Sequence, residues 1–343
     1  MAGLEHITGS SARSGKLGTS ILGRALSSSI GNGLMTLLER MEVRRPNLLQ
    51  VLTYHRIENA AGFEQQMKYL ANHYHVISMS ELIAAFQSAR ILPTRSAMIT
   101  FDDAYRNFAD CAWPVLRRYK LPVTVFVPTA FPGQSDRLFW WDQLEHALRL
   151  TPRRDELETP IGRFSLDSAN ARRRAYRHLR SYVKSLPHSE ALIWSNQICD
   201  ALGAPMPDQS VLDWDELRRL AREGVTLGAH TRTHPLLNRV STEEARDEAV
   251  GSLRDLEREI GDVPPILAYP DGRVTDDVVR ALERAGFVLA FTIVRGTNDL
   301  RTADRLRLRR INVGERAALS VLRARLLQAT PYLNQWRPLA GSS

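Results

Sequence analysis

Short apolar runs rich in β-branched residues recur along most of the chain, separated by segments whose apolar residues follow helical spacing. Each run has the length of a buried strand and ends in polar or turn-forming residues. Strands that alternate with helices form parallel βαβ units, so the pattern predicts an α/β fold. The predicted strands occupy residues 48–55, 97–101, 122–127, 225–229, 265–269 and 287–292.

The segments between these runs carry signals for helix ends. Ser80 is expected to cap a helix over residues 80–90, because a serine side chain can accept from the first free N–H groups. Asp213, with a glutamate three residues later, has the spacing of a capping box. The helical pattern over residues 106–120 contains Pro114, which should kink or divide it.

Two parts of the chain depart from the alternation. Residues 132–210 contain helix-like, arginine-rich segments with few strand signals, and we interpret them as a helical arm inserted into one domain. Residues 1–46 are rich in Gly and Ser, and they fit an extension that is either helical or flexible. The predicted organisation is therefore an extension at 1–46, one domain at 47–320 and a C-terminal helix and tail at 321–343.

Composition excludes some classes of protein. The chain has 343 residues, 43% hydrophobic and 24% charged, which is typical of a globular protein. No segment is apolar enough to span a membrane, and no secretory signal is visible, so we expect a cytoplasmic protein. Apolar residues at helical spacing over 17–41 leave peripheral contact with the inner face of a membrane as an alternative to packing on the domain.

The net charge of +8 comes from arginine. Arginine and leucine alternate over residues 305–309, which predicts a half-buried strand with an arginine face. The basic segments lack interleaved aromatic residues, so we do not expect a nucleic-acid site.

Chemically active residues gather at the ends of the predicted strands. Asp102 and Asp103 directly follow one strand, and two adjacent carboxylates repel each other unless a cation or a proton is shared. An ordinary loop start with solvated aspartates is the alternative. His55, His230 and Tyr269 stand at the ends of other strands, which is where α/β folds place their chemistry.

His230 and His234 are separated by three residues and followed by a proline. This spacing is weak by itself, but a loop can aim both imidazoles at one point. Together with a carboxylate from the acid pair they would form a His₂-Asp site. Such a site suits a divalent metal, most often zinc, with cobalt or nickel as alternatives.

The sequence resembles the polysaccharide deacetylases, which are the NodB-homology enzymes of carbohydrate esterase family 4. The matching motifs are Thr100-Phe101-Asp102-Asp103, His230-Thr231-Arg232-Thr233-His234 and Tyr269-Pro270-Asp271-Gly272. Tyr54-His55-Arg56-Ile57 is similar to a subgroup that modifies exopolysaccharides. The resemblance covers about residues 48–315. It implies a distorted (β/α) barrel of about seven strands and metal-dependent removal of N-acetyl groups from hexosamine residues.

Carried over position by position, the resemblance makes Asp103, His230 and His234 the metal ligands. Asp102 would be the base that takes a proton from the attacking water. A backbone N–H near Asp271 would help to stabilise the oxyanion.

The chain departs from the family pattern at the proton donor. Many members place an acid histidine near the C-terminus, whereas this chain has no histidine after His234. We therefore predict that His55 donates the proton to the departing amine, with a histidine bonded only to backbone as the alternative.

A second departure concerns the third motif. Ala268 stands where many relatives have an arginine that orients the catalytic aspartate, and Arg106 or Arg56 could compensate. Ala104 replaces a glycine that usually follows the acid pair. Residues predicted to contact the substrate are Tyr54, Arg106, Tyr269, Pro270 and Asp271, with Trp140, Trp141 and Trp214 as further candidates for stacking on sugars.

The sequence thus predicts a hydrolase that deacetylates an N-acetylhexosamine unit in an exopolysaccharide or its lipid-linked precursor. Two alternatives remain open. One is a deacetylase or deformylase acting on a small amide that is not a sugar, and the other is a carbohydrate-binding module without turnover.

Overall fold

The structure, a computed structural model, describes residues 45–88, 90–134, 138–205, 210–314 and 316–328, together with residues 33, 36, 37 and 39. The helical pattern predicted over 17–41 and the C-terminal tail fall largely outside these residues. Among the described residues, no helix is both long and apolar enough to cross a membrane.

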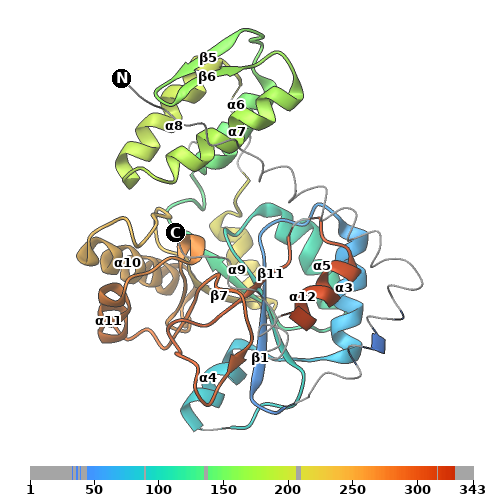
Figure 1. Cartoon of the computed structure of the whole chain (residues 1–343). Helices are drawn as coiled ribbons and strands as arrows, with labels where there is room; N and C mark the ends of the chain where they lie inside the picture. Colours follow the sequence, from blue (N-terminus) through green and yellow to red (C-terminus); the bar gives the residue numbers. More distant parts are fainter. Residues whose placement is uncertain are drawn as a thin grey trace, which may run out of the picture.

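The main element is a curled, mostly parallel sheet, which runs through the centre of the molecule (Figure 1). Along the sheet the strands follow the order β10-β1-β3-β4-β7-β8-β9. All neighbours on this path are parallel except β10, which pairs antiparallel with β1. The strands are β1 (Leu48–Tyr54), β3 (Ser96–Phe101), β4 (Thr124–Val127), β7 (Thr226–Ala229), β8 (Ile266–Ala268), β9 (Leu289–Phe291) and β10 (Asn298–Asp299), with β2 (His75–Val76) beside β3 and β11 (Ile311–Asn312) beside β1.

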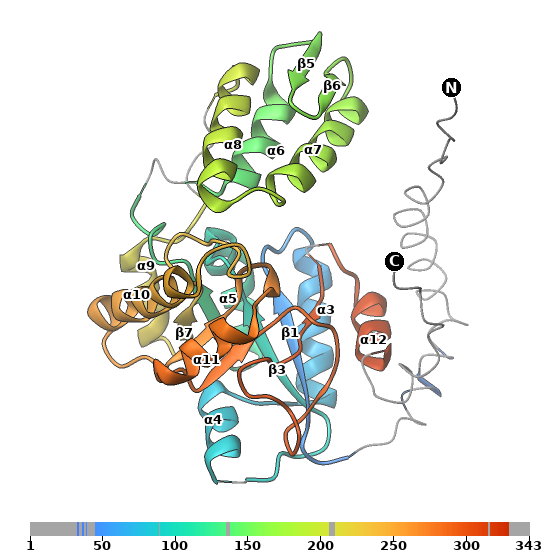
Figure 2. The same cartoon turned by 60° about the vertical axis from the view of Figure 1, so that its left-hand side comes forward.

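Helices cover the outside of this sheet, as the sequence pattern predicts (Figure 2). A π-helical turn, η1 (Phe108–Ala112), precedes α5, so the helix predicted over 106–120 is divided at Pro114, which lies in the first turn of α5. The helices are α3 (Ala60–His73), α4 (Met79–Ser88), α5 (Trp113–Arg118), α9 (Trp214–Arg222), α10 (Thr242–Ile260), α11 (Asp276–Arg284) and α12 (Leu319–Gln328).

The two faces of the sheet bury different sets of side chains. Alternate strand residues such as Val51, Met98 and Phe126 point into the barrel, where α4 contributes Leu82 to the same apolar cluster. The residues between them pack against the outer helices. Side chains alternate along a strand, so a residue at a strand end faces the same side as the residue two positions before it. This decides whether it faces the barrel interior or the helix layer.

Two helix starts show how local sequence sets the boundaries. The Asp213 side chain accepts from the Glu216 N–H, and Glu216 accepts from the Asp213 N–H, so the predicted capping box is confirmed. Ser78, and not Ser80, occupies the corresponding position at α4: its hydroxyl accepts from the Glu81 N–H at 3.2 Å.

The arm forms a separate layer above one end of the barrel (Figures 1 and 2). It has its own apolar core, which includes Leu144, Leu179 and Leu202. A β-hairpin lies within it that the sequence did not predict, because its strands are short and largely exposed. The elements are α6 (Trp140–Leu150), β5 (Glu156–Thr159), β6 (Gly162–Ser165), α7 (Ala169–Val183) and α8 (His188–Leu202).

The strand predicted at 305–309 is not formed, since only Leu308 makes an isolated bridge to β9. The alternation is nevertheless real: Leu306 and Leu308 are buried, whereas Arg305 and Arg307 reach carboxylates at the surface. The backbone of this segment bonds to β9 around Leu308, with the Leu308 N–H donating to the Ala290 carbonyl at 2.9 Å, but the pairing is too short to form a strand.

Candidate active site and metal centre

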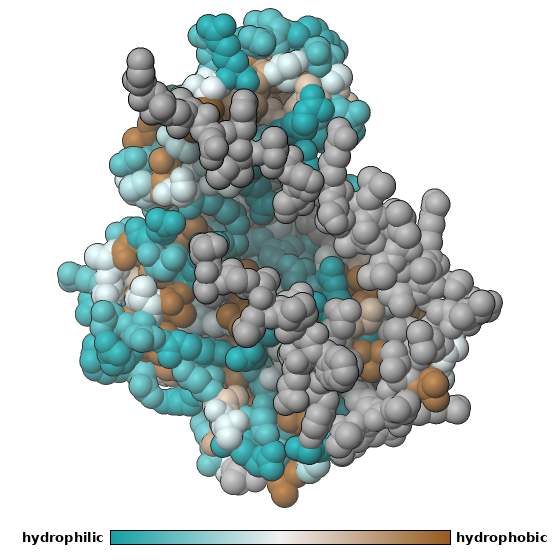
Figure 3. All heavy atoms as spheres, viewed as in Figure 1, coloured by the Kyte–Doolittle hydropathy of each residue, from teal (hydrophilic) through white to brown (hydrophobic). Residues whose placement is uncertain are grey.

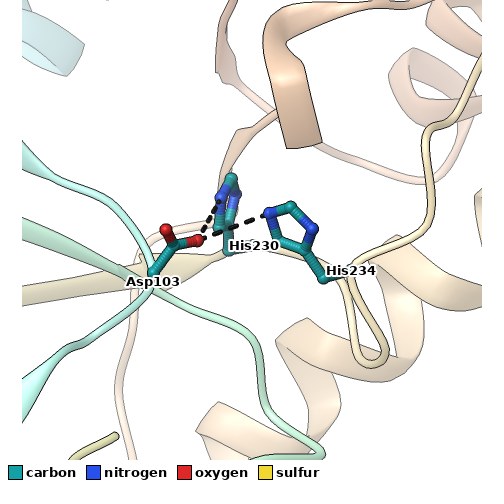
Figure 4. Close-up of side chains that lie close together, drawn as sticks. All are labelled: Asp103, His230 and His234. Atoms are coloured by element: carbon teal, nitrogen blue, oxygen red, sulfur yellow. Dashed lines mark ion pairs between the residues drawn. The ribbon is translucent and has the colours of Figure 1, made fainter. Parts of the chain in front are cut away.

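The chemically active residues lie at the C-terminal ends of β3 and β7, two parallel strands that flank β4 in the sheet. Asp102 and Asp103 follow β3, His230 follows β7, and His234 lies in the loop after β7. Figure 4 shows Asp103, His230 and His234 pointing toward one another. The parallel sheet therefore brings together residues that are more than a hundred positions apart in the sequence.

The three ligand atoms have the spacing of a metal site. Asp103 Oδ1 lies 3.5 Å from His230 Nε2 and 3.4 Å from His234 Nε2. Two atoms bound at about 2.1 Å to a tetrahedral ion would be about 3.4 Å apart. Asp103 Oδ1 is also buried without a hydrogen-bond partner among the described residues. A buried carboxylate oxygen facing two imidazoles fits a divalent cation.

A backbone contact sets the orientation of one imidazole. His230 Nδ1 lies 2.7 Å from the Ala268 carbonyl oxygen at the end of β8. If this nitrogen carries the proton and donates it, the Nε2 lone pair faces Asp103, which is the arrangement that metal-ligating histidines use. Ala268, where relatives have an arginine, therefore still contributes to the site through its backbone.

Protonation of the cluster follows from burial and charge. Burial opposes ionisation of Asp103, but the imidazoles of His230 and His234 hold its pKa well below the usual value. Burial lowers the pKa of His234, which favours the neutral form that binds metals. For His230 burial acts in the same direction, but the carboxylates of Asp103 and Asp102 outweigh it and raise the pKa.

Asp102 is held by an arginine that the sequence analysis did not assign to the site. The Arg310 guanidinium makes two parallel hydrogen bonds of 2.7 Å, one to each carboxylate oxygen. Its Nε donates to the Thr292 carbonyl at 2.8 Å, and its side chain has no exposed surface. Burial would raise the pKa of Asp102, but Arg310 outweighs it and keeps the pKa low, so the carboxylate stays ionised.

The two arginines predicted to orient Asp102 are engaged elsewhere. Arg106 pairs with Glu216 at 2.5 Å, and Arg56 pairs with Asp142. The prediction that one of them compensates for the missing family arginine is wrong. The sequence nevertheless contained an indication of this role. Position 310 continues the alternation of the buried Leu306 and Leu308, so its side chain is expected to point inward as theirs do.

His55 lies beside the base. Its Nε2 is 4.0 Å from Asp102 Oδ2, and about a third of its side chain (32%) is exposed. An imidazole at the mouth of the site can reach both Asp102 and a bound substrate. Its role as proton donor stays a prediction.

Two of the predicted sugar contacts are corrected by the structure. The Tyr54 side chain is 2% exposed and its hydroxyl donates to Gln66 at 2.8 Å. Tyr269 is fully buried and its hydroxyl donates to the Leu306 carbonyl at 2.8 Å. Both belong to the apolar cluster under the outer helices, so their parity turns them away from the barrel interior. Pro270 is buried as well.

Asp271 remains at the rim of the site. Its carboxylate lies 2.6 Å from Lys184 Nζ of the arm and 3.2 Å from Arg273 Nε. Its exposure is compatible with substrate contact, which stays a prediction for Asp271 and Arg106. Trp214 is half-buried against the outer core and is not placed at the metal centre by any contact among the described residues.

The start of the arm forms an aromatic wall of the metal centre. The Trp141 ring stacks on Phe139 and lies 4.9 Å from the His234 ring. The Trp141 indole N–H donates to the Tyr105 hydroxyl at 3.1 Å, and this hydroxyl contacts Asp142. Burial raises the pKa of Asp142 to about 6 despite its ion pair with an arginine. Trp141 is therefore the best placed of the three candidate tryptophans.

Unusual backbone conformations gather at the same place. Asp103, Ala104, Thr231, His234 and Asp271 all have positive φ. L-residues adopt this conformation at a cost, and its concentration is typical of functional sites. Ala104 has a φ of +49°, a conformation that glycine would adopt without the steric cost of a Cβ atom.

Comparisons with known proteins identify the family of the chain. The sequence profile described as Polysaccharide deacetylase matches residues 89–290. YxkH of Bacillus subtilis (strain 168), assigned by name to the polysaccharide deacetylases, is 20% identical over 264 residues, which is 75% of this chain and 68% of that protein.

A shorter match and one solved structure add to this. The poly-beta-1,6-N-acetyl-D-glucosamine N-deacetylase of Staphylococcus aureus (strain N315) is 31% identical over 74 residues, 22% of this chain and 26% of that protein. The Streptococcus pyogenes deacetylase PplD, solved in complex with acetate, has a similar fold, with a TM-score of 0.55 and 19% identity, covering 83% of this chain and 99% of that one.

The fold and the site thus define a distorted (β/α) barrel with its candidate chemistry at the C-terminal ends of the strands. The chain belongs to the polysaccharide deacetylase family. The family and the distorted barrel predicted from the sequence motifs are both confirmed.

Proposed function

We propose that this protein is a divalent-metal-dependent N-deacetylase that hydrolyses acetamide groups of N-acetylhexosamine residues in an exopolysaccharide or its lipid-linked precursor. The observation that carries the proposal is the convergence of Asp103, His230 and His234 beside a second, separately held carboxylate, Asp102. A binding module has no need for an ionised, oriented base next to a metal-ligand set.

Each residue has a distinct task in this reaction. Asp103, His230 and His234 would hold the ion, and when bound it supplies Lewis-acid chemistry for attack on an acyl carbon. Asp102 accepts the proton of the attacking water at a carboxylate oxygen, because Arg310 keeps it ionised and fixed. His55, 4.0 Å from Asp102, donates a proton to the departing amine.

The sugar class is inferred from the family and from the wall of the site. Trp141 offers a half-buried aromatic surface beside His234, and aromatic faces suit the apolar faces of sugar rings. The Staphylococcus aureus relative is named for acting on a β-1,6-linked N-acetylglucosamine polymer. We extend that substrate class to this chain at the level of the N-acetylhexosamine unit.

Acetate release tests the proposal. The purified full chain would be assayed on N-acetylglucosamine oligomers and on N-methylacetamide, with zinc, with cobalt and with a chelator. We expect acetate from the oligomers only when metal is present, and none from an Asp102→Asn variant that still binds metal. Acetate from the simple amide at equal efficiency would instead assign the protein to small amides. Chelator-resistant turnover would contradict metal dependence.

A further inference from the structure

Helix α7 of the arm carries an unusual set of charges. Its arginines are Arg172, Arg173, Arg174, Arg177 and Arg180, and it contains no acidic residue. Arg172 is buried and donates to backbone carbonyls of the arm, including Leu166 at 2.9 Å, so it is structural. The other four side chains are exposed. The structural role of Arg172 therefore does not account for these four arginines.

Three of these arginines form a line along the helix. With 3.6 residues per turn, positions 173, 177, 180 and 184 fall within about 60° of one another around the axis. Eleven residues at about 1.5 Å each extend over roughly 16 Å. We call Arg173, Arg177 and Arg180 the α7 cationic stripe, and Lys184 stands at its end.

The stripe has no counterion among the residues that the structure describes. Among the described residues, none of its three arginines forms an ion pair with a carboxylate, and Arg173 contacts only the neutral Asn170. Other arginines of the arm are different: Arg153 and Arg163 lie 2.8 Å and 2.7 Å from the carboxylates of Asp155 and Glu158. Three aligned, uncompensated cations raise the local potential and attract anions.

The stripe leads to the metal centre. Lys184 Nζ lies 2.6 Å from Asp271 Oδ1, and Asp271 is three residues after Ala268, whose carbonyl contacts His230. Tyr176, on the flank of the stripe, lies close enough to Asp142 for that charge to act on its pKa. The junction of α7 and α8 lies on the side of the arm that faces the barrel (Figure 2).

A hollow lies between parts of the arm and the barrel. Figure 3 shows a hollow between the arm and the barrel whose visible walls are mainly hydrophilic. A polymer lying in this hollow would pass the rim of the metal centre and the foot of the arm.

We propose that the α7 cationic stripe binds the acidic groups of a glycan chain, so that the substrate is an acidic polysaccharide rather than a neutral one. The inference rests on the proposed function and narrows it to N-acetylhexosamine units within a chain that also carries carboxylates.

The arrangement of the cations favours a linear polyanion over a compact or membrane-bound anion. A single diphosphate spans only part of the stripe, which is roughly 10 Å long from position 173 to position 180, whereas acidic groups repeated along a glycan can meet several arginines. A helix that lies on a lipid surface needs an exposed apolar face. None of the exposed large apolar side chains of the described residues lies on α7.

A paired comparison of variants tests the proposal. Arg177→Gln/Arg180→Gln removes two charges from the stripe, and Arg254→Gln/Arg284→Gln removes two exposed charges from α10 and α11 as the matched control. Both full-length variants would be assayed with zinc on two hexasaccharides. One alternates glucuronic acid with N-acetylglucosamine, and the other contains N-acetylglucosamine alone. Binding of the acidic oligomer would also be measured by calorimetry.

We expect the stripe variant to raise KM and Kd for the acidic oligomer about two- to twentyfold at low salt, with kcat unchanged. The effect should largely disappear near 1 M salt, where screening is strong. The neutral oligomer and the control variant should be unaffected.

Equal affinity of the stripe variant and the wild type for the acidic oligomer would overturn the proposal. So would binding to phosphatidylglycerol vesicles that depends on Arg177 and Arg180 while glycan binding does not. If the wild type released acetate from neither oligomer, the proposed function would fail, and calorimetry would still decide whether the stripe binds acidic glycan.

Discussion

Replacing Arg310 by methionine is the sharpest perturbation that the structure offers. The Arg310 guanidinium is fully buried, and it satisfies both carboxylate oxygens of Asp102 at 2.7 Å. It also donates to the Thr292 carbonyl at 2.8 Å and to the Thr53 hydroxyl at 3.1 Å. Methionine fills much of the same volume but donates no hydrogen bond, so the substitution isolates the polar role.

The expected cost follows from the charge left behind. Asp102 is 3% exposed, so without Arg310 its carboxylate becomes a buried, unpaired charge. Removing one partner of a buried ion pair typically costs about 3–5 kcal/mol. That is a large part of the roughly 5–15 kcal/mol that stabilises a folded domain. Because Asp102 would also lose its orientation, we expect kcat to fall about 10- to 100-fold.

Arg305→Met supplies a matched control on the same segment. Arg305 lies 2.7 Å from Glu283, but the two side chains are 42% and 53% exposed. Exposed pairs contribute only about 0–1 kcal/mol. Urea denaturation followed by circular dichroism would compare the two variants, and Arg310→Met/Asp102→Asn would complete a double-mutant cycle.

The double variant should recover much of the loss, because neither charge remains buried. A cost below about 1 kcal/mol for Arg310→Met, or equal costs for the two single arginine variants, would refute the reasoning. Lysine at position 310 should restore part of the stability but little of kcat, since an ammonium cannot bind both carboxylate oxygens in the same geometry.

Three further predictions concern the metal, the acid and a loop. The pKa of His230 is raised above its ordinary value of 6.5 and that of His234 is lowered, so about one proton should be released per zinc ion bound near pH 6.5. Zinc affinity should therefore fall as the pH drops. Calorimetry in buffers of different ionisation enthalpy measures the number of protons released, and a number near zero or two would contradict this prediction. His55→Gln should lower kcat at least tenfold and leave zinc affinity unchanged, whereas full activity would remove it from catalysis. Gly272→Ala should lower the melting temperature more than Gly286→Ala. Both glycines have positive φ, but of the two only Gly272 would place the new methyl group against backbone, at 2.2 Å. Equal shifts in melting temperature would contradict this prediction.

The strands, and the closeness of Asp103, His230 and His234, could be predicted because both follow from the hydrophobic pattern and from the order of parallel strands. Strands buried on both faces appear as apolar runs, and parallel order places Asp102, Asp103 and His230 at one edge of the sheet. Asp103, His230 and His234, the predicted metal ligands, lie close together where those rules put them.

Three errors at the site share one physical origin, which is the alternation of side chains between the two faces of an extended segment. Tyr54 and Tyr269 stand beside site residues in sequence, yet alternation turns them toward the helix layer. Arg310 was not assigned to the site from the sequence, although it is separated from the buried Leu306 and Leu308 by an even number of positions and so points the same way. A buried arginine is rare without a partner, and its partner lies 208 residues away, so only the tertiary structure identifies the pair.

The sheet pairing has a consequence for how the chain folds. The first strand, β1, pairs on one side with β3. Its other side pairs with β10 and β11, which residues 298–312 supply much later in the chain. At about 5–20 residues per second, a ribosome needs roughly 13–50 s to make that interval. During this time one edge of β1 is unpaired and can join foreign strands. We expect truncated chains that end near residue 295 to aggregate. We also expect Asp102, the proposed base, to pair with Arg310 only in the last stage of synthesis.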